Sequence, residues 1–204
     1  MTQKQKESGK FIVFGARGRV GRAVVAEARA RGYEVTEAGR GDGDVPSAAD
    51  VARLAAGHDV AVAAVYDMGA VPGAFFPAAA RALAAGLPEA GVRRLVSVGL
   101  ASVLPTESGA LLMDTPGYPQ EWREFYVGHA AGTEALRAAA PAGLDWAVLS
   151  PAGDFTAEED PRDGYAFAAA DAEARITNAD FARAVLDEAL SPTVHHVHAG
   201  VTAS

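Results

Sequence analysis

Residues 11–25 read FIVFGARGRVGRAVV, an apolar run that meets three evenly spaced glycines and continues into an Ala/Val segment with helical periodicity. A strand, a glycine turn and a helix in this order are typical of a dinucleotide-binding turn. Gly15 would permit the tight turn, Gly18 would let the backbone approach a pyrophosphate, and Gly21 would let the helix pack closely. The alternative is a tight turn that binds nothing.

The predicted strand covers Lys10–Phe14 and the predicted helix covers Arg19–Arg31. The first N–H groups of a helix have no intrahelical partner and carry the positive end of its dipole. We therefore expect the backbone of Arg19, Val20 and Gly21 to face the cofactor phosphates. No Gly-Lys-Ser/Thr follows the glycines, which argues against a phosphate-loop kinase.

Short apolar runs alternate with amphipathic Ala-rich segments along the rest of the chain. The other predicted strands are Tyr33–Ala38, Asp59–Val65, Val92–Val98, Leu144–Leu149 and Val194–Val201. The other predicted helices are a segment that Ser47 caps and that ends at Ala56, then Pro72–Ala85, Gln120–Ala139 and a segment that Asn178 caps and that ends at Leu190. Two further short strands, Tyr165–Ala168 and Ala174–Thr177, are expected to pair with each other.

This alternation predicts an α/β fold, a doubly wound, mostly parallel sheet with helices on both faces. Ligands of such sheets bind beyond the carboxyl ends of the strands, where the strand order reverses. The irregular segments 100–119 and 150–163 each follow a strand, so we expect them to be substrate loops on the ligand side. The carboxylates Glu158, Glu159 and Asp160 read as a solvated charge run.

Composition narrows the class of protein further. The 204 residues suit a single domain, predicted over 10–204, after a disordered tail at 1–9. The sequence has no cysteine, no apolar run long enough to cross a bilayer and no signal-peptide pattern, which favours a cytoplasmic protein. The net charge of −8 disfavours nucleic acid, so the expected partner is a small molecule.

The end of the second strand should select the cofactor. An NAD site places an acidic residue there for the ribose diol, and an NADP site places an arginine for the 2′-phosphate. Glu37 fits the first pattern, whereas Arg40, with Arg17 from the glycine turn, fits the second. We favour NADP(H) over NAD(H), with Glu37 turned away from the ligand.

The chain resembles the atypical short-chain dehydrogenase/reductase superfamily. The residues that carry the resemblance are FIVFGARGRVGRAVVAEARARGYEVTEAGR, AGVRRLVSVGLAS, LDWAVLSPAGDF and RITNADFARAVLDEAL. The similarity extends over residues 11–201 and is strongest to small NAD(P)H-binding proteins of the NmrA-like and biliverdin reductase B/flavin reductase-like kinds. It implies a Rossmann fold, a nicotinamide cofactor and a substrate pocket under the loops that follow the fourth and fifth strands.

The helix that carries Tyr-x-x-x-Lys in this superfamily departs from the pattern. Tyr126 stands at the tyrosine position, but Ala130 replaces the lysine that lowers the tyrosine pKa. Similar members carry a histidine nearby, and His129 is the matching candidate to donate a proton or position the nicotinamide. A helix histidine bonded to a neighbour is the equally weighted alternative.

Other site residues follow from the same resemblance. A serine after the fourth strand polarises the substrate in the superfamily, and Ser102 is preferred to Ser97 for this role. The segment with Pro151 and Gly153 is expected to pass the nicotinamide. Aromatic side chains are candidates for the pocket wall, although core packing is their commoner role: Tyr118, Trp122, Phe125 and Phe155.

The expected function is an NADP(H)-dependent oxidoreductase acting on a small apolar carbonyl, quinone or flavin-like compound. The missing lysine keeps open a non-catalytic NADP(H)-binding redox sensor or regulator, and a cofactor-bound isomerase or dehydratase. No metal is expected, because only His196 and His198 of the HHVHAG segment share a strand face and no acidic or Cys ligand is nearby in the sequence. The oligomeric state is expected to be a monomer or a homodimer.

Overall fold

The computed structural model describes residues 9–157 and 164–204. Most of the predicted tail and the whole charge run at 158–160 lie outside the described residues. In the described part, seven strands form one sheet with the order β2-β1-β3-β4-β5-β9-β7. All neighbours are parallel except β7, which runs antiparallel to β9. The Rossmann-like α/β fold is therefore confirmed.

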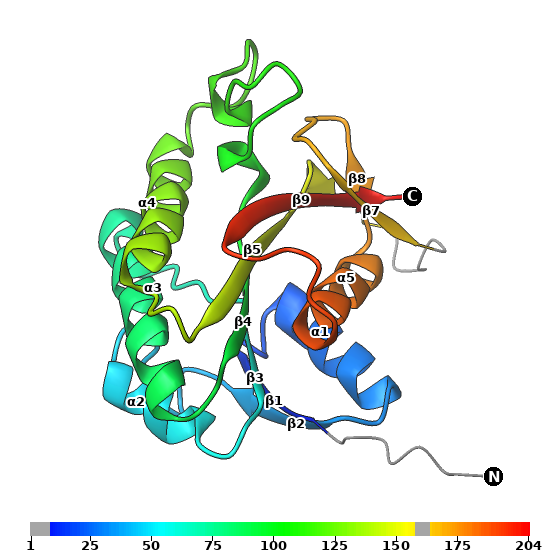
Figure 1. Cartoon of the computed structure of the whole chain (residues 1–204). Helices are drawn as coiled ribbons and strands as arrows, with labels where there is room; N and C mark the ends of the chain where they lie inside the picture. The colour runs from blue at the N-terminus through cyan, green and yellow to red at the C-terminus, as the bar shows by residue number, and fades with distance from the viewer. Residues whose placement is uncertain (1–8, 158–163) are drawn as a thin grey trace, which may run out of the picture.

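The elements can be followed in Figure 1. The strands are β1 (Lys10–Phe14), β2 (Glu34–Ala38), β3 (Val60–Ala63), β4 (Arg94–Val98), β5 (Asp145–Pro151), β6 (Asp154–Phe155), β7 (Tyr165–Ala168), β8 (Arg175–Ile176) and β9 (Val197–Ala203). The helices are α1 (Arg19–Ala30), α2 (Ala48–Ala55), α3 (Pro72–Glu89), α4 (Arg123–Ala139) and α5 (Asn178–Leu190), with short 3-10 turns at Ala101–Val103 and Leu112–Asp114.

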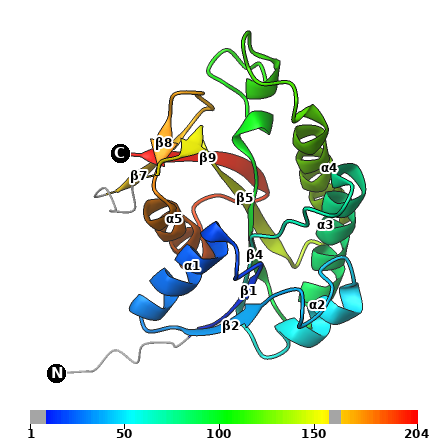
Figure 2. The same ribbon diagram turned by 180° about the vertical axis from the view of Figure 1, so that it is seen from behind.

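Helices cover both faces of the sheet, as Figure 2 shows from behind: α1 and α5 lie on one face, and α2, α3 and α4 lie on the other. The alternation of side chains along β1 explains the two cores. Phe11 and Val13 pack under α1 and α5, whereas Ile12 and Phe14 pack under α2 and α3. A strand that is apolar on both faces requires a sheet that is covered on both faces, as it is here.

Several expected element boundaries differ from those of the structure. Helix α3 continues through Pro88 to Glu89, because a proline in the last turn removes only one helical hydrogen bond. Thr177 rather than Asn178 caps α5, since its hydroxyl accepts the N–H of Asp180. The segment from residue 150 is not all loop: Ser150 and Pro151 extend β5, and β6 follows.

The expected pairing of the two short strands was also wrong. Strand β7 pairs with β9, and β8 pairs in parallel with β6, so these two short strands do not pair with each other. The segment between β7 and β8 makes hydrogen bonds with other parts of the chain instead. The N–H of Ala170 donates to the carbonyl of Pro105, and the N–H of Asp171 donates to the carbonyl of Ala152. These long-range hydrogen bonds tie the region to the 100–119 loop and to the end of β5.

Candidate functional site

The glycine turn lies where the strand order reverses. The chain runs from β1 to β2 on one side and then crosses to β3 on the other side, which places a crevice at their carboxyl ends. Gly15 has a φ of 76° and donates its N–H to Ala38 at 2.9 Å. A Cβ at Gly15 would overlap the carbonyl oxygen of Ala64. The turn is therefore wedged between the ends of β2 and β3, where only glycine fits.

The start of α1 has the features of an anion site. Gly18 is the N-cap, with no side-chain cap and no acidic residue in the first turn. A Cβ at Gly21 would overlap the carbonyl of Gly15 and lie 2.9 Å from the Cα of Ala16, so Gly21 lets α1 pack against the turn. The side chain of Arg19 is exposed. This start of α1 fits the phosphates of a dinucleotide.

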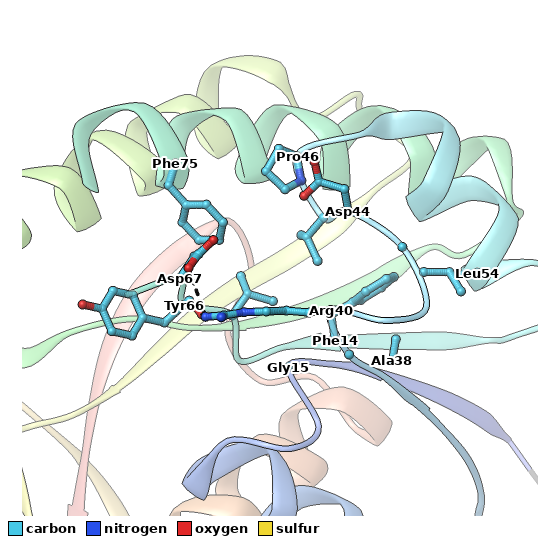
Figure 3. Close-up of a pocket in the computed structure, with 14 residues that line it drawn as sticks. Phe14, Gly15, Ala38, Arg40, Asp44, Pro46, Leu54, Tyr66, Asp67 and Phe75 are labelled. Carbon is cyan, nitrogen blue, oxygen red and sulfur yellow. Dashed lines mark hydrogen bonds and ion pairs between the residues drawn. The ribbon is translucent and has the colours of Figure 1, made fainter. Parts of the chain in front are cut away.

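A cavity of about 280 Å³ lies beside the turn, between the carboxyl ends of β1, β2 and β3 and the start of α3 (Figure 3). Its wall combines apolar side chains with a few charged ones, as is usual for a nucleotide-sized site. The lining residues are Phe14, Gly15, Ala38, Gly39, Arg40, Gly43, Asp44, Val45, Pro46, Leu54, Val65, Tyr66, Asp67 and Phe75.

Several of these residues were not singled out from the sequence. Asp44, Val45, Tyr66, Asp67 and Phe75 have no motif of their own. The available signal was positional, because all five follow the carboxyl ends of β2 or β3. Within the described chain, the Asp44 carboxylate has no hydrogen-bond or ion-pair partner, so it can accept from a ligand.

The two residues considered for cofactor selection, Glu37 and Arg40, lie on different sides of the end of β2, and only Arg40 lines the cavity. Glu37 pairs with Arg29 of α1 at 2.7 Å and does not line the cavity. Arg40 lines it, and its Nη2 lies 3.0 Å from Asp67 Oδ1. Arg17 lies over Gly39, and its guanidinium is 3.9 Å from the Asp42 carboxylate. Both arginines thus lie at the end of β2.

A second, wider cavity of about 540 Å³ lies under the 100–119 loop, facing the end of β5 and the segment before β8. Ser102 is 2% exposed, and its Oγ lies 2.9 Å from the Tyr118 hydroxyl. The Tyr118 and Tyr126 rings meet edge to face at 5.7 Å. Gly153 also lines this cavity, and Pro151 ends β5 just before it. Three predicted hydroxyl-bearing residues therefore gather here.

Burial raises the pKa of Tyr126, and the neighbouring Tyr118 and Glu121 add to the effect. The side chain of Tyr126 is thus a weak acid held in its neutral form. Three predicted wall residues lie elsewhere, and one of them, Phe125, meets the rings of Phe76 and His129 edge to face. Trp122 is 62% exposed at the start of α4, and Phe155 packs edge to face on Phe181 in the core at 5.4 Å.

His129 is not in the cavity with Ser102. Its side chain projects from α4 into a cavity of about 40 Å³ that Ser97 and Thr133 also line. Its ring contacts Phe76, with centroids 3.8 Å apart, and meets Phe125 edge to face. Burial lowers the pKa of His129 to about 3, and the nearby His198 contributes. His129 is therefore neutral at neutral pH.

The histidines of HHVHAG have different hydrogen-bond partners. His198 Nε2 lies 2.6 Å from Ser150 Oγ, and burial lowers its pKa to about 4. His195 Nδ1 lies 2.9 Å from Asp145, and His196 Nε2 lies 3.8 Å from the same carboxylate. No group of three or more potential metal ligands occurs among the residues that the structure describes.

The strand order, the glycine turn and the cavity beside it define a nucleotide-binding α/β protein. Comparison with known proteins narrows the class: the chain belongs to the NAD(P)H-binding family, which matches residues 15–192. The start of that match coincides with Gly15, the first residue of the turn.

The chain is similar to several proteins over nearly its whole length. It is 31% identical to the uncharacterised protein YwnB of Bacillus subtilis (strain 168), over 90% of this chain and 93% of that one. A candidate exported protein from Burkholderia pseudomallei has a TM-score of 0.80 at 28% identity, over 95% of this chain and 99% of that one. A candidate NADH-flavin reductase from Streptococcus pneumoniae has a TM-score of 0.79 at 24% identity, over 96% of this chain and 100% of that one.

In the described part of the chain, no helix is long and apolar enough to cross a membrane.

Proposed function

We propose that this protein binds NADP(H) along the carboxyl edge of its sheet and transfers hydride to or from a small, largely apolar carbonyl, quinone or flavin-like compound. The observation that carries the proposal is the cavity beside the glycine turn, at the switch point between β1 and β3. The bound nicotinamide would supply or accept the hydride. The protein would supply binding, orientation and the proton.

The adenosine half suits the cavity of about 280 Å³ by its chemistry. Phe75, Val45 and Leu54 offer apolar surface for a planar base, and the Asp44 carboxylate can accept from an exocyclic amino group. The backbone at the start of α1 would hold the pyrophosphate. Arg40 and Arg17 would both bind a 2′-phosphate, which supports NADP(H) over NAD(H).

The substrate half would occupy the cavity under the 100–119 loop. Tyr118 and Ser102 share a hydrogen bond there, so either hydroxyl can hold a proton while the other accepts. His129 lies in a separate cavity and is neutral, which supports a positioning role under α4 rather than proton donation. A flavin or quinone acceptor needs no strong acid, which makes Ala130 in place of a lysine tolerable.

A non-catalytic NADP(H) sensor is the second candidate function. It is favoured by one observation: Ala130 occupies the position that would carry the activating lysine, next to a Tyr126 of raised pKa. A sensor would bind reduced and oxidised cofactor with different affinities and consume neither.

Both candidates are tested by calorimetric titration with NADPH, NADP, NADH and NAD, followed by an acceptor screen with flavins, quinones and aldehydes. Tight NADPH binding with turnover of an acceptor supports the reductase. Binding without turnover of any acceptor supports the sensor. A protein that binds none of the four nucleotides contradicts both candidates.

A further inference from the structure

We propose that Asp67 is a specificity-determining residue of the nucleotide site, because its carboxylate competes with a 2′-phosphate for Arg40. The inference rests on the proposed function and concerns the cofactor preference of the same site. It predicts that the protein prefers NADP(H) over NAD(H) less strongly than the presence of Arg17 and Arg40 alone would indicate.

The contact crosses the mouth of the cavity. Arg40 follows β2 and Asp67 follows β3, and these strands lie on opposite sides of β1. Figure 3 shows the Arg40 side chain extended across the cavity toward Asp67, with the ion pair drawn as a dashed line. The guanidinium Nη2 lies 3.0 Å from Asp67 Oδ1 and 3.4 Å from the Tyr66 carbonyl oxygen. The group that would bind the phosphate is thus already bound on the β3 side.

The other arginine is paired as well. Arg17 lies 3.9 Å from Asp42, and Asp42 also accepts the N–H of Gly39 at 2.8 Å. Asp44 adds a third carboxylate to the cavity. Two arginines and three aspartates give these five side chains a formal net charge of −1. A dianionic 2′-phosphate would enter a region without excess positive charge.

The exposure of Arg40 and Asp67 indicates whether Asp67 strengthens or weakens binding of the 2′-phosphate. The Arg40 side chain is 72% exposed and that of Asp67 is 39% exposed, and exposed ion pairs contribute little to stability. Separating Arg40 from Asp67 therefore costs little. The negative charge of Asp67 remains beside the cavity, however, and repels the phosphate. We expect repulsion to outweigh any benefit of holding Arg40 in place.

Asp67→Asn removes this charge and keeps the shape of the side chain. Asp67 Oδ1 also accepts the N–H of Gly69 at 3.0 Å, and an amide oxygen can retain that bond. The local turn should therefore survive the substitution. Glu34→Gln is the matched control, because it removes one exposed carboxylate from the amino end of β2, opposite to the site.

The test measures the calorimetric affinities of 2′,5′-ADP and 5′-AMP, which differ by the phosphate in question. Asp67→Asn should tighten 2′,5′-ADP binding about three- to tenfold at low salt and change 5′-AMP binding less than about twofold. Glu34→Gln should change neither. In an Arg40→Ala background, the gain from Asp67→Asn should shrink to the part that is due to repulsion, because no guanidinium remains for Asp67 to compete for.

Two results overturn the proposal while leaving the site intact. Weaker 2′,5′-ADP binding in Asp67→Asn would show that Asp67 orients Arg40 for the phosphate. Equal effects on the two nucleotides, or none, would show that Asp67 does not sense the 2′-phosphate. Failure of every form to bind either nucleotide overturns the dinucleotide site itself, and this proposal with it.

Discussion

The hydroxyl groups of Ser102 and Tyr118 lie 2.9 Å apart at the floor of the cavity under the 100–119 loop. Ser102 follows β4, and Tyr118 lies at the far end of the loop, so the loop folds back on itself. Together with Tyr126, which meets the Tyr118 ring at 5.7 Å, they form the hydroxyl-bearing part of the proposed substrate site. Their relative importance can be measured.

We expect Tyr118→Phe and Ser102→Ala each to lower kcat about 10- to 100-fold, because each breaks the hydroxyl pair that would handle the proton. NADPH affinity should stay within about twofold, since neither residue lines the cavity by the glycine turn. Tyr126→Phe is the matched control and should cost less than about threefold. A larger loss in Tyr126→Phe than in Tyr118→Phe would place proton transfer on α4 instead.

Gly21→Ala tests whether the close packing of α1 against the glycine turn is needed for cofactor binding. The added Cβ would meet the backbone of Gly15 and Ala16, which cannot move without displacing β1 or α1. We expect a loss of about 1–3 kcal/mol in the free energy of unfolding and at least a tenfold loss of NADPH affinity. Gly73→Ala in α3 is the control, because its Cβ would meet nothing within 4 Å. Unchanged affinity in Gly21→Ala would argue against phosphate binding at α1.

Stability should fall in mild acid because of two partly buried histidines, His129 and His198. The folded pKa values of His129 and His198 are lowered to about 3 and about 4, below the ordinary value of 6.5. The unfolded chain therefore takes up these protons first. The contribution of the two neutral rings to stability is complete above about pH 6.5 and is lost as the pH falls toward about 4 for His198 and about 3 for His129.

Urea unfolding at several pH values between 7 and 5 measures this loss. His129→Gln and His198→Gln should each reduce the slope of unfolding free energy against pH by up to about 1.4 kcal/mol per pH unit. A slope that neither substitution changes would show that these rings do not remain neutral in the folded protein.

Arg94 is predicted to be the most sensitive charged residue for stability. Its side chain is 7% exposed, and its guanidinium lies 2.9 Å from Asp145 and 3.4 Å from Glu188. Arg94→Ala would leave the Glu188 carboxylate buried without its cation, which we expect to cost about 3–5 kcal/mol in chemical unfolding. Arg53→Ala, which removes the exposed pair with Asp50, should cost less than about 1 kcal/mol. Equal costs for the two variants would contradict the buried network.

The local pattern of the sequence was sufficient for the parts of the fold that depend on neighbouring residues. The strand Lys10–Phe14 and the helix after it match the structure to within a residue, because apolar periodicity and glycine report on local backbone conformation. The direction of Glu37, away from the ligand crevice, also agrees with its pair to Arg29. The NAD(P)H-binding family could likewise be anticipated from the glycine spacing and its context.

Tertiary structure alone decided which distant residues meet. The pairing of β7 with β9, the ion pair between Arg40 and Asp67 across β1, and the hydrogen bond between Ser102 and Tyr118 depend on strand order and loop path. The tertiary structure also places His129 and Tyr126, which lie three residues apart on α4, in different cavities. Tyr126 lines the cavity with Ser102, whereas His129 lines the cavity with Ser97. A sequence pattern records spacing along one chain segment, whereas contacts between segments are set by how the whole sheet packs.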